Sequence, residues 1–352
     1  ESPHENMQFL FFFSAVLSAV YKHQDLLRIS IASASNDHRL GANEAPPAII
    51  SAYIGEQLED IIKQLLNGGL KKSMKSGLMG LGSPVLPTIP KHAGDRNRTS
   101  PFAFTGNKFE FRAVGSSQSV SFPIVVLNTA VSEAIDTMCT SLEKKMEEKD
   151  LELSLKEVLV ETMSEARDII FNGDGYSDDW QKEAEKRGLL NLKSTADALP
   201  HLTKEKNINL FEKYNVMTGR EIHSRLEIWA EQYVTNLNIE VDTTEAIART
   251  MVYPAAIRYI KELSAAVKET GDLGLDNYGS KEMLTTVNGA LNDLGKAMID
   301  LKKVQDDLKN ESLIELCVEY REKIIPAMGK IRDSVDYLER YTADDYWPLP
   351  IY

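Results

Sequence analysis

Helical periodicity dominates the 352-residue sequence from Pro123 onward and limits the possible folds more than any other feature. Apolar residues recur there at spacings of three and four, which predicts helices with one buried face. The clearest series is Leu284, Val287, Leu291, Leu294, Met298 and Leu301. Such stripes need partner helices, so a helical bundle explains them better than a cofactor pocket does. The predicted helices cover residues 123–147, 154–171, 178–188, 218–238, 243–269, 279–309 and 311–341.

The first third of the chain is expected to contribute strands. The segment NKFEFRAV, residues 107–114, alternates polar and apolar side chains as a half-buried strand does. The run LLRISIAS, residues 26–33, shows similar alternation and predicts another strand. Pro47 suits the first turn of a helix that continues through ISAYIGEQLEDIIKQLL to Leu66. Strands followed by a long helical region predict the α+β class.

The apolar segment MQFLFFFSAVLSAVY, residues 7–21, raises the question of a signal peptide or membrane anchor. It spans 15 residues and includes two serines, whereas crossing a bilayer takes about 20 residues. The preceding residues lack the basic region of a signal peptide. We therefore predict a buried helix with Pro3 at its start.

The charge of the chain is unevenly distributed. The net charge is −13, yet residues 1–122 hold 12 Lys/Arg against 10 Asp/Glu, so the acidity belongs to the C-terminal part. This distribution excludes nucleic acid as an expected partner and leaves the first third able to attract small anions. Two cysteines, Cys139 and Cys317, lie in predicted helices. They imply no disulfide framework and fit a reducing cytoplasm.

A loop in the first third concentrates side chains with possible chemical roles. The residues NDHRLGANEA, 36–45, include Arg39 and Glu44 and are followed by two prolines. A loop held between regular elements can present such side chains at fixed positions. A surface loop with a structural ion pair would contain the same residue types.

The strand predicted at residues 107–114 carries a second group. Lys108, Glu110 and Arg112 share one face, with Phe109 and Phe111 on the other. Neighbours on the same face lie roughly 7 Å apart, close enough to share a phosphate or a metal ion. A solvent-facing strand would show the same alternation.

The fourteen residues NDHRLGANEAPPAI closely resemble the signature of the type III glutamine synthetases. The resemblance implies that Arg39 binds the substrate glutamate. It also implies that Glu44 belongs to a flap over the active site, where it closes the site, helps to bind ammonium and accepts a proton.

The elements NRTS and KFEFR, residues 97–100 and 108–112, resemble the paired motif of the same family. By that resemblance, Glu110 matches a ligand of a catalytic divalent metal and Arg112 contacts the substrate and the transferred phosphate. Arg98 matches the arginine of the nucleotide phosphate site, and Lys108 a basic nucleotide contact. The segment PFAF after NRTS and the tail GSSQSVSFP depart from the general family pattern.

The resemblance also implies a fold, a reaction and an assembly. Residues 1–150 would form the C-terminal part of the catalytic domain, with part of its curved antiparallel sheet, and residues 151–352 a mainly α-helical C-terminal extension. The implied reaction ligates ammonia to L-glutamate through a γ-glutamyl phosphate, with ATP as phosphate donor and Mg²⁺ or Mn²⁺ as cofactor. The expected assembly is a cytoplasmic stacked-ring homo-oligomer, a dodecamer, without nucleic-acid or membrane partners.

The family's other metal-binding glutamates and its small N-terminal domain would precede Glu1. This chain is therefore expected to be inactive alone. A non-enzymatic helical assembly module and another ATP-dependent phosphotransferase remain open as alternatives.

Two other segments resemble binding loops only in composition. The glycine- and lysine-rich residues 70–101 match no phosphate-binding pattern, and we predict a long ordered loop or mobile lid. The segment NGDGYSDDW, 172–180, lacks the register of a calcium loop. It is predicted to connect two helices, with Ser177 as the N-cap.

Overall fold

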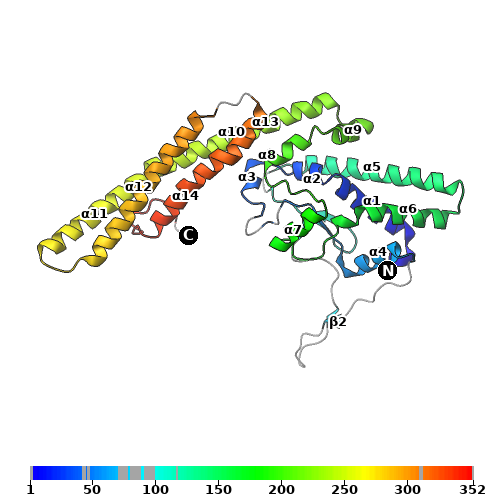
Figure 1. The fold of residues 1–352 in the computed structure, drawn as a ribbon, viewed down its shortest axis with the longest axis horizontal. Helices are drawn as coiled ribbons and strands as arrows, with labels where there is room; N and C mark the ends of the chain where they lie inside the picture. The colour runs from blue at the N-terminus through cyan, green and yellow to red at the C-terminus, as the bar shows by residue number, and fades with distance from the viewer. Residues whose placement is uncertain are drawn as a thin grey trace. The chain divides into compact units, whose positions relative to one another are not determined.

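The computed structural model describes residues 3–41, 45, 48–69, 78–79, 89–90, 100–115, 118–308 and 312–350. The chain forms two compact units, Glu1–Leu226 and Glu227–Tyr352, and the division falls within one long helix (Figure 1). The predicted boundary at residue 150 separates family domains rather than compact units, and it stays a prediction.

The first unit is mainly helical. Short 3₁₀ turns lie at Pro3–Glu5, Arg167–Ile169 and Leu199–His201. Its α-helices are α1 (Met7–Lys22), α2 (Gln24–Ile29), α3 (Ala34–Asp37), α4 (Gly55–Leu66), α5 (Ser121–Met146), α6 (Leu151–Ala166), α7 (Asp178–Lys186), α8 (Thr195–Ala198) and α9 (Glu205–Lys213).

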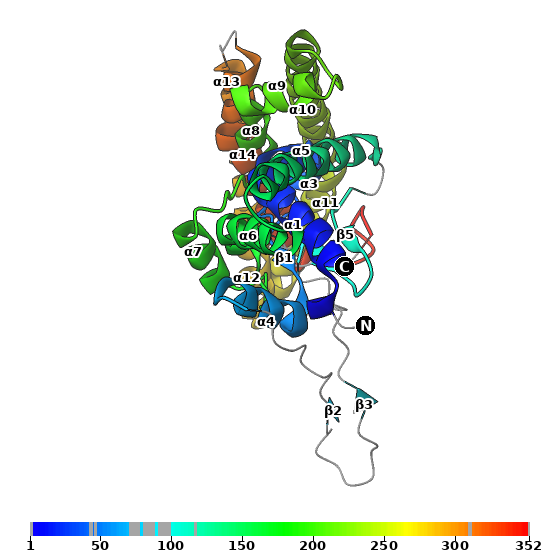
Figure 2. The ribbon, with the colours of Figure 1, turned by 90° about the vertical axis from the view of Figure 1, so that its right-hand side faces the viewer.

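Helix α1 is the apolar segment near the start of the chain, and it lies between α5 and α6 (Figures 1 and 2). Leu17 and Val20 are fully buried, so the prediction of a buried helix is confirmed. The Asn6 side chain caps the helix by accepting a hydrogen bond of 2.9 Å from the Phe9 amide. Pro3 begins only the 3₁₀ turn ahead of it.

Helix α5 has the length and composition of a bilayer-spanning helix, a test that core helices of soluble proteins also pass.

A small mixed sheet lies beside α1. Its strands are β1 (Ala52–Tyr53), β4 (Phe102–Phe104) and β5 (Phe109–Phe111). Strand β4 is central, parallel to β1 and antiparallel to β5. A separate antiparallel pair is formed by β2 (Leu78–Met79) and β3 (Ile89–Pro90). The rest of the loop predicted at 70–101 lies outside the described residues, apart from its last two. A mainly helical fold with a small sheet agrees with the broad α+β prediction.

The strand predicted at residues 26–33 is wrong. Residues 24–29 form α2, and all six are buried. Alternation over so few residues cannot separate a strand from a buried helix. Distant contacts decide the conformation, because the Arg28 guanidinium donates a hydrogen bond of 2.8 Å to the Leu192 carbonyl.

The helix predicted from Pro47 starts later, at Gly55. Ala52 instead pairs with Phe102 in the sheet, and the Phe171 amide donates to the Ala52 carbonyl at 2.9 Å. The cap of α4 comes from far along the chain. Asn172 Oδ1 accepts hydrogen bonds of 2.9 Å from the amides of Ile54 and Gly55.

The second unit is built from long helices. These are the latter part of α10 (Gly219–Ile247), then α11 (Tyr253–Asp272), α12 (Tyr278–Asp306), α13 (Leu313–Glu319) and α14 (Ile325–Glu339), with π-helical turns at Ala248–Val252 and Tyr320–Ile324. Helix α12 packs against both α11 and α14 (Figure 1). Of its predicted stripe, Val287, Leu294 and Leu301 are essentially inaccessible, which confirms that face as core.

The break predicted between residues 238 and 243 is wrong, because α10 continues through it. The irregularity falls instead at the π-helical turn ahead of Pro254. Helices α8 and α9 were not predicted.

Candidate functional site

Strand β5 and the residues next to its two ends, Lys108 and Arg112, bring two cations and a carboxylate together on one face. Lys108 Nζ lies 3.2 Å from Glu110 Oε1, and Arg112 Nη2 lies 3.2 Å from Glu110 Oε2. Arg112 Nε donates a second hydrogen bond to the same Oε2 at 3.2 Å. The predicted grouping of these three side chains is confirmed, since alternation along a strand places every second residue on one face.

Glu110 stays ionised in this setting. The hydrogen bond from Lys108 is the main reason that its pKa lies below the ordinary value; partial burial opposes the shift, and Arg112 adds to it. With two cations and one anion, the face carries net positive charge. Such a surface attracts phosphate and carboxylate groups.

The opposite face of β5 is fixed by aromatic packing. The Phe109 ring lies 5.4 Å from that of Phe13 on α1, and 5.2 Å from the rings of both Phe102 and Phe104 on β4. The turn between the strands closes with a hydrogen bond of 2.9 Å from the Thr105 amide to the Lys108 carbonyl. Rigid packing on one face thus holds the charged residues of the other face in register.

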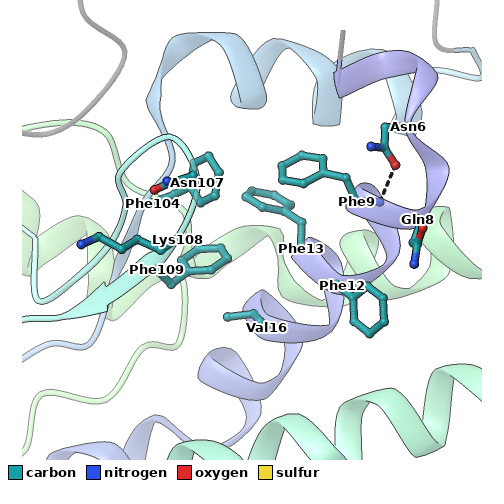
Figure 3. Close-up of a pocket in the computed structure, with 10 residues that line it drawn as sticks. All are labelled: Asn6, Gln8, Phe9, Phe12, Phe13, Val16, Phe104, Asn107, Lys108 and Phe109. Atoms are coloured by element: carbon teal, nitrogen blue, oxygen red, sulfur yellow. Dashed lines mark hydrogen bonds between the residues drawn. The ribbon is translucent and has the colours of Figure 1, made fainter. Parts of the chain in front are cut away.

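A groove of about 370 Å³ opens beside this packing. Figure 3 shows Phe9, Phe13, Phe104 and Phe109 turned toward one another at the groove, with the Lys108 ammonium directed away from the rings. The groove is mostly apolar, and Lys108 borders both it and the charged face.

The turn that carries Arg39 follows α3. Ser33 caps α3 by accepting from the Asn36 amide at 3.2 Å. The Asn36 carbonyl then accepts from the amides of Arg39 and Leu40, both at 3.0 Å. The Arg39 side chain is exposed at the protein surface.

Asp37 fixes the same turn to a segment more than 150 residues away. Its carboxylate accepts hydrogen bonds of 2.8 Å from both the amide and the hydroxyl of Thr195. Arg28 Nη2 lies 3.4 Å from the same carboxylate. Helix α3 and the start of α8 are therefore held together.

The sequence-predicted site residues divide into three groups. The structure brings Lys108, Glu110 and Arg112 together, and it places Arg39 on a separate element. Glu44 and Arg98 lie outside the described residues, so their predicted roles stay predictions.

Divalent metal ions prefer oxygen ligands such as the Glu110 carboxylate. In the part of the chain that the structure describes, no group of three or more His, Cys, Asp or Glu side chains is placed to hold an ion. The donor type therefore fits Mg²⁺ or Mn²⁺, but the number of ligands falls short.

A buried polar cluster around Asp25 escaped the sequence analysis. Its carboxylate lies 2.9 Å from Lys206 Nζ and 3.6 Å from His201 Nδ1, and it accepts a hydrogen bond of 3.1 Å from Asn207. Burial alone raises the pKa of Asp25, but the contacts with His201, Lys206 and Asn207 outweigh it and hold the pKa far below its usual range. A charged residue beside an apolar run was the only sequence signal.

Known relatives match this chain along its whole length, and a family model matches part of it. A family model described as the glutamine synthetase C-terminal domain matches residues 154–271. The type-3 glutamine synthetase of Dictyostelium discoideum is 38% identical over 361 residues, which cover all of this chain and 49% of that protein. The glutamine synthetases of Bacteroides fragilis and Butyrivibrio fibrisolvens are 36% and 34% identical, again over the whole chain and 50% of each relative. The chain thus spans about half the length of these relatives.

Proposed function

The chain belongs to the glutamine synthetase family, and we propose that it supplies part of the active site of an ATP-dependent glutamate–ammonia ligase. The observation that carries this proposal is the charged face of β5, where Lys108 and Arg112 flank Glu110. In this proposal β4 and β5 belong to the curved antiparallel sheet of the catalytic domain. The helices that follow form its C-terminal extension.

The proposed reaction explains why these residue types are needed. The γ-carboxylate of glutamate attacks the γ-phosphate of ATP, and ammonia then displaces phosphate from the γ-glutamyl phosphate. Several negative charges meet in one place, and fixed cations stabilise them with little covalent work from the protein. Arg112 would neutralise the charge of the reacting groups. Arg98 and Lys108 would neutralise the nucleotide phosphates, and Arg39 would hold the substrate glutamate.

Glu110 would supply one oxygen ligand for Mg²⁺ or Mn²⁺, which neutralises phosphate charge when bound. The remaining ligands would come from elsewhere in the full-length protein. The chain alone is therefore expected to be inactive. Glu44 would act as a flap residue that excludes water and accepts a proton from ammonium.

We further propose that the protein works as a cytoplasmic stacked-ring homo-oligomer, a dodecamer in this family. This proposal rests on the similarity to glutamine synthetases.

Two substitutions in the full-length protein test the assignment, with ADP release measured as a function of glutamate and ammonium. Arg112→Ala should lower kcat/KM by at least about 100-fold, the scale of losing one charge-stabilising group in an active site. Glu110→Gln should weaken the dependence on Mg²⁺ or Mn²⁺. Arg332→Ala is the matched control, because Arg332 is 64% exposed on α14 and, among the residues that the structure describes, forms an ion pair along its own helix with Asp336.

Full activity in both site variants would refute the site assignment. ADP release that does not depend on glutamate and ammonium would instead point to another phosphotransferase.

A further inference from the structure

Helix α2 is held along its polar face to the segment 190–207. Gln24 Oε1 accepts a hydrogen bond of 2.7 Å from the Leu190 amide. Arg28 donates to the carbonyls of Leu192, at 2.8 Å, and Lys193, at 3.4 Å. Asp25 binds side chains farther along the same segment. Because the Asp25 and Arg28 side chains are only 1% exposed, water competes little for these contacts.

These contacts of Gln24, Asp25 and Arg28 form the polar frame of α2. The frame extends through Asp37 to the turn that carries Arg39. The Asp37 side chain, 6% exposed, joins Arg28 on α2 to Thr195 at the start of α8. Asn36 precedes it and is itself 2% exposed, with its side-chain Nδ2 donating a hydrogen bond to the Ile31 carbonyl. Two consecutive residues are therefore fixed, and Arg39 is attached two residues after the second of them.

We propose that Asp37 and Thr195 are positioning residues that set the backbone of the Arg39 turn for glutamate binding. The proposal rests on the proposed function, in which Arg39 holds the substrate glutamate. It adds that a segment within the helical extension, residues 190–195, determines substrate affinity without touching the substrate. A misplacement of about 1 Å at a binding group is enough to weaken a site strongly.

The test uses four substitutions in the full-length protein, three at the start of α8 and one at Arg39. Thr195→Val removes the hydroxyl donor and keeps the side-chain volume and backbone amide, whereas Thr195→Ser retains the donor. Ser194→Ala is the matched control. Ser194 lies at the same helix start, where its hydroxyl forms a capping box with Asp197.

Thr195→Val should raise KM for glutamate about tenfold, which corresponds to one lost hydrogen bond of about 1.4 kcal/mol. KM for ATP should stay within about twofold. Thr195→Ser should keep KM for glutamate close to the wild-type value. Ser194→Ala should lower the melting temperature without raising KM for glutamate. Hydrogen exchange of residues 38–41 should accelerate in Thr195→Val alone, and this readout does not depend on activity.

Arg39→Ala separates the hypothesis that Arg39 binds glutamate from the hypothesis that Asp37 and Thr195 position its turn. If Arg39→Ala leaves KM for glutamate unchanged, the substrate role of Arg39 is wrong, whatever the exchange data show. If Arg39→Ala raises KM while Thr195→Val changes neither KM nor the exchange of residues 38–41, the positioning role is overturned. An equal rise in KM for glutamate in Ser194→Ala also overturns it, since general loosening of α8 would then suffice.

Discussion

The aromatic contacts of β4 predict how strongly the charged strand is held. Phe102 is 2% exposed, and its ring lies 5.2 Å from that of Phe109 and 6.3 Å from that of Phe111. Phe102→Leu keeps an apolar side chain of similar reach but removes both ring pairs. Each pair contributes about 0.5–1.5 kcal/mol beyond area burial, so the first unit should lose about 1–3 kcal/mol of unfolding free energy.

Urea unfolding measures this loss if the reporter lies in the first unit. Trp180 is 2% exposed and stacks on Phe171 with ring centroids 3.7 Å apart. The other two tryptophans, Trp229 and Trp347, belong to the second unit. Replacing both with phenylalanine leaves Trp180 as the one tryptophan of these 352 residues, so the unfolding experiment uses this chain.

Phe12→Leu is the matched control, because Phe12 is 49% exposed on α1. Phe12 makes one edge-on ring pair, 5.9 Å from Phe11, and the pair is partly exposed to solvent, so the unfolding free energy should fall by about 0.5 kcal/mol, the low end for one ring pair. Equal losses in Phe102→Leu and Phe12→Leu would refute the idea that ring packing fixes β5.

Two other substitutions test the remaining anchors of the first unit. Asn172→Ala should lower the unfolding free energy by about 1–2 kcal/mol, because it removes the cap of α4. Faster hydrogen exchange of the Ile54 and Gly55 amides would locate the loss at the start of α4, and unchanged exchange would contradict the prediction. For Glu133, the hydrogen bond from His23 is the main reason that its pKa falls from 4.5 to about 2; partial burial opposes this and Lys22 adds to it. Because the folded-state pKa is the lower one, the stabilisation is present above pH 4.5 and is lost as the pH falls toward 2. The full pKa shift corresponds to about 3 kcal/mol of unfolding free energy. The Glu133 side chain is still 15% exposed, so solvent screens the pair and we expect a measured contribution of about half that value. The stability gap between wild type and Glu133→Gln should shrink from pH 7 to pH 3, and a constant gap would count against the pair.

Local patterns predicted the parts of the site that depend on neighbouring residues alone. The common face of Lys108, Glu110 and Arg112 follows from the two-residue period of a strand. Ser177 was also predicted correctly, and its hydroxyl accepts from the Trp180 amide at 3.2 Å. Neither feature needs a partner from another part of the chain.

The features that could not be predicted depend on distant partners. The start of α4 is set by Asn172, which follows Ile54 by 118 residues. The short helix α2 is fixed by contacts with residues 190–207, since Arg28 would be too costly to bury without acceptors for its guanidinium. A single sequence carries no signal that pairs residues so far apart.

The two segments that carry the proposed chemistry are held by different forces. Strand β5 relies on aromatic rings, whose packing depends little on salt or pH. The Arg39 turn relies on hydrogen bonds to the Asp37 carboxylate, which is nearly buried and therefore weakly screened by salt. Substitutions that weaken apolar packing should thus disturb phosphate and metal binding at β5 first. Changes in the polar frame of α2 should instead act first on glutamate affinity, so the two kinds of substitution separate the two halves of the proposed site.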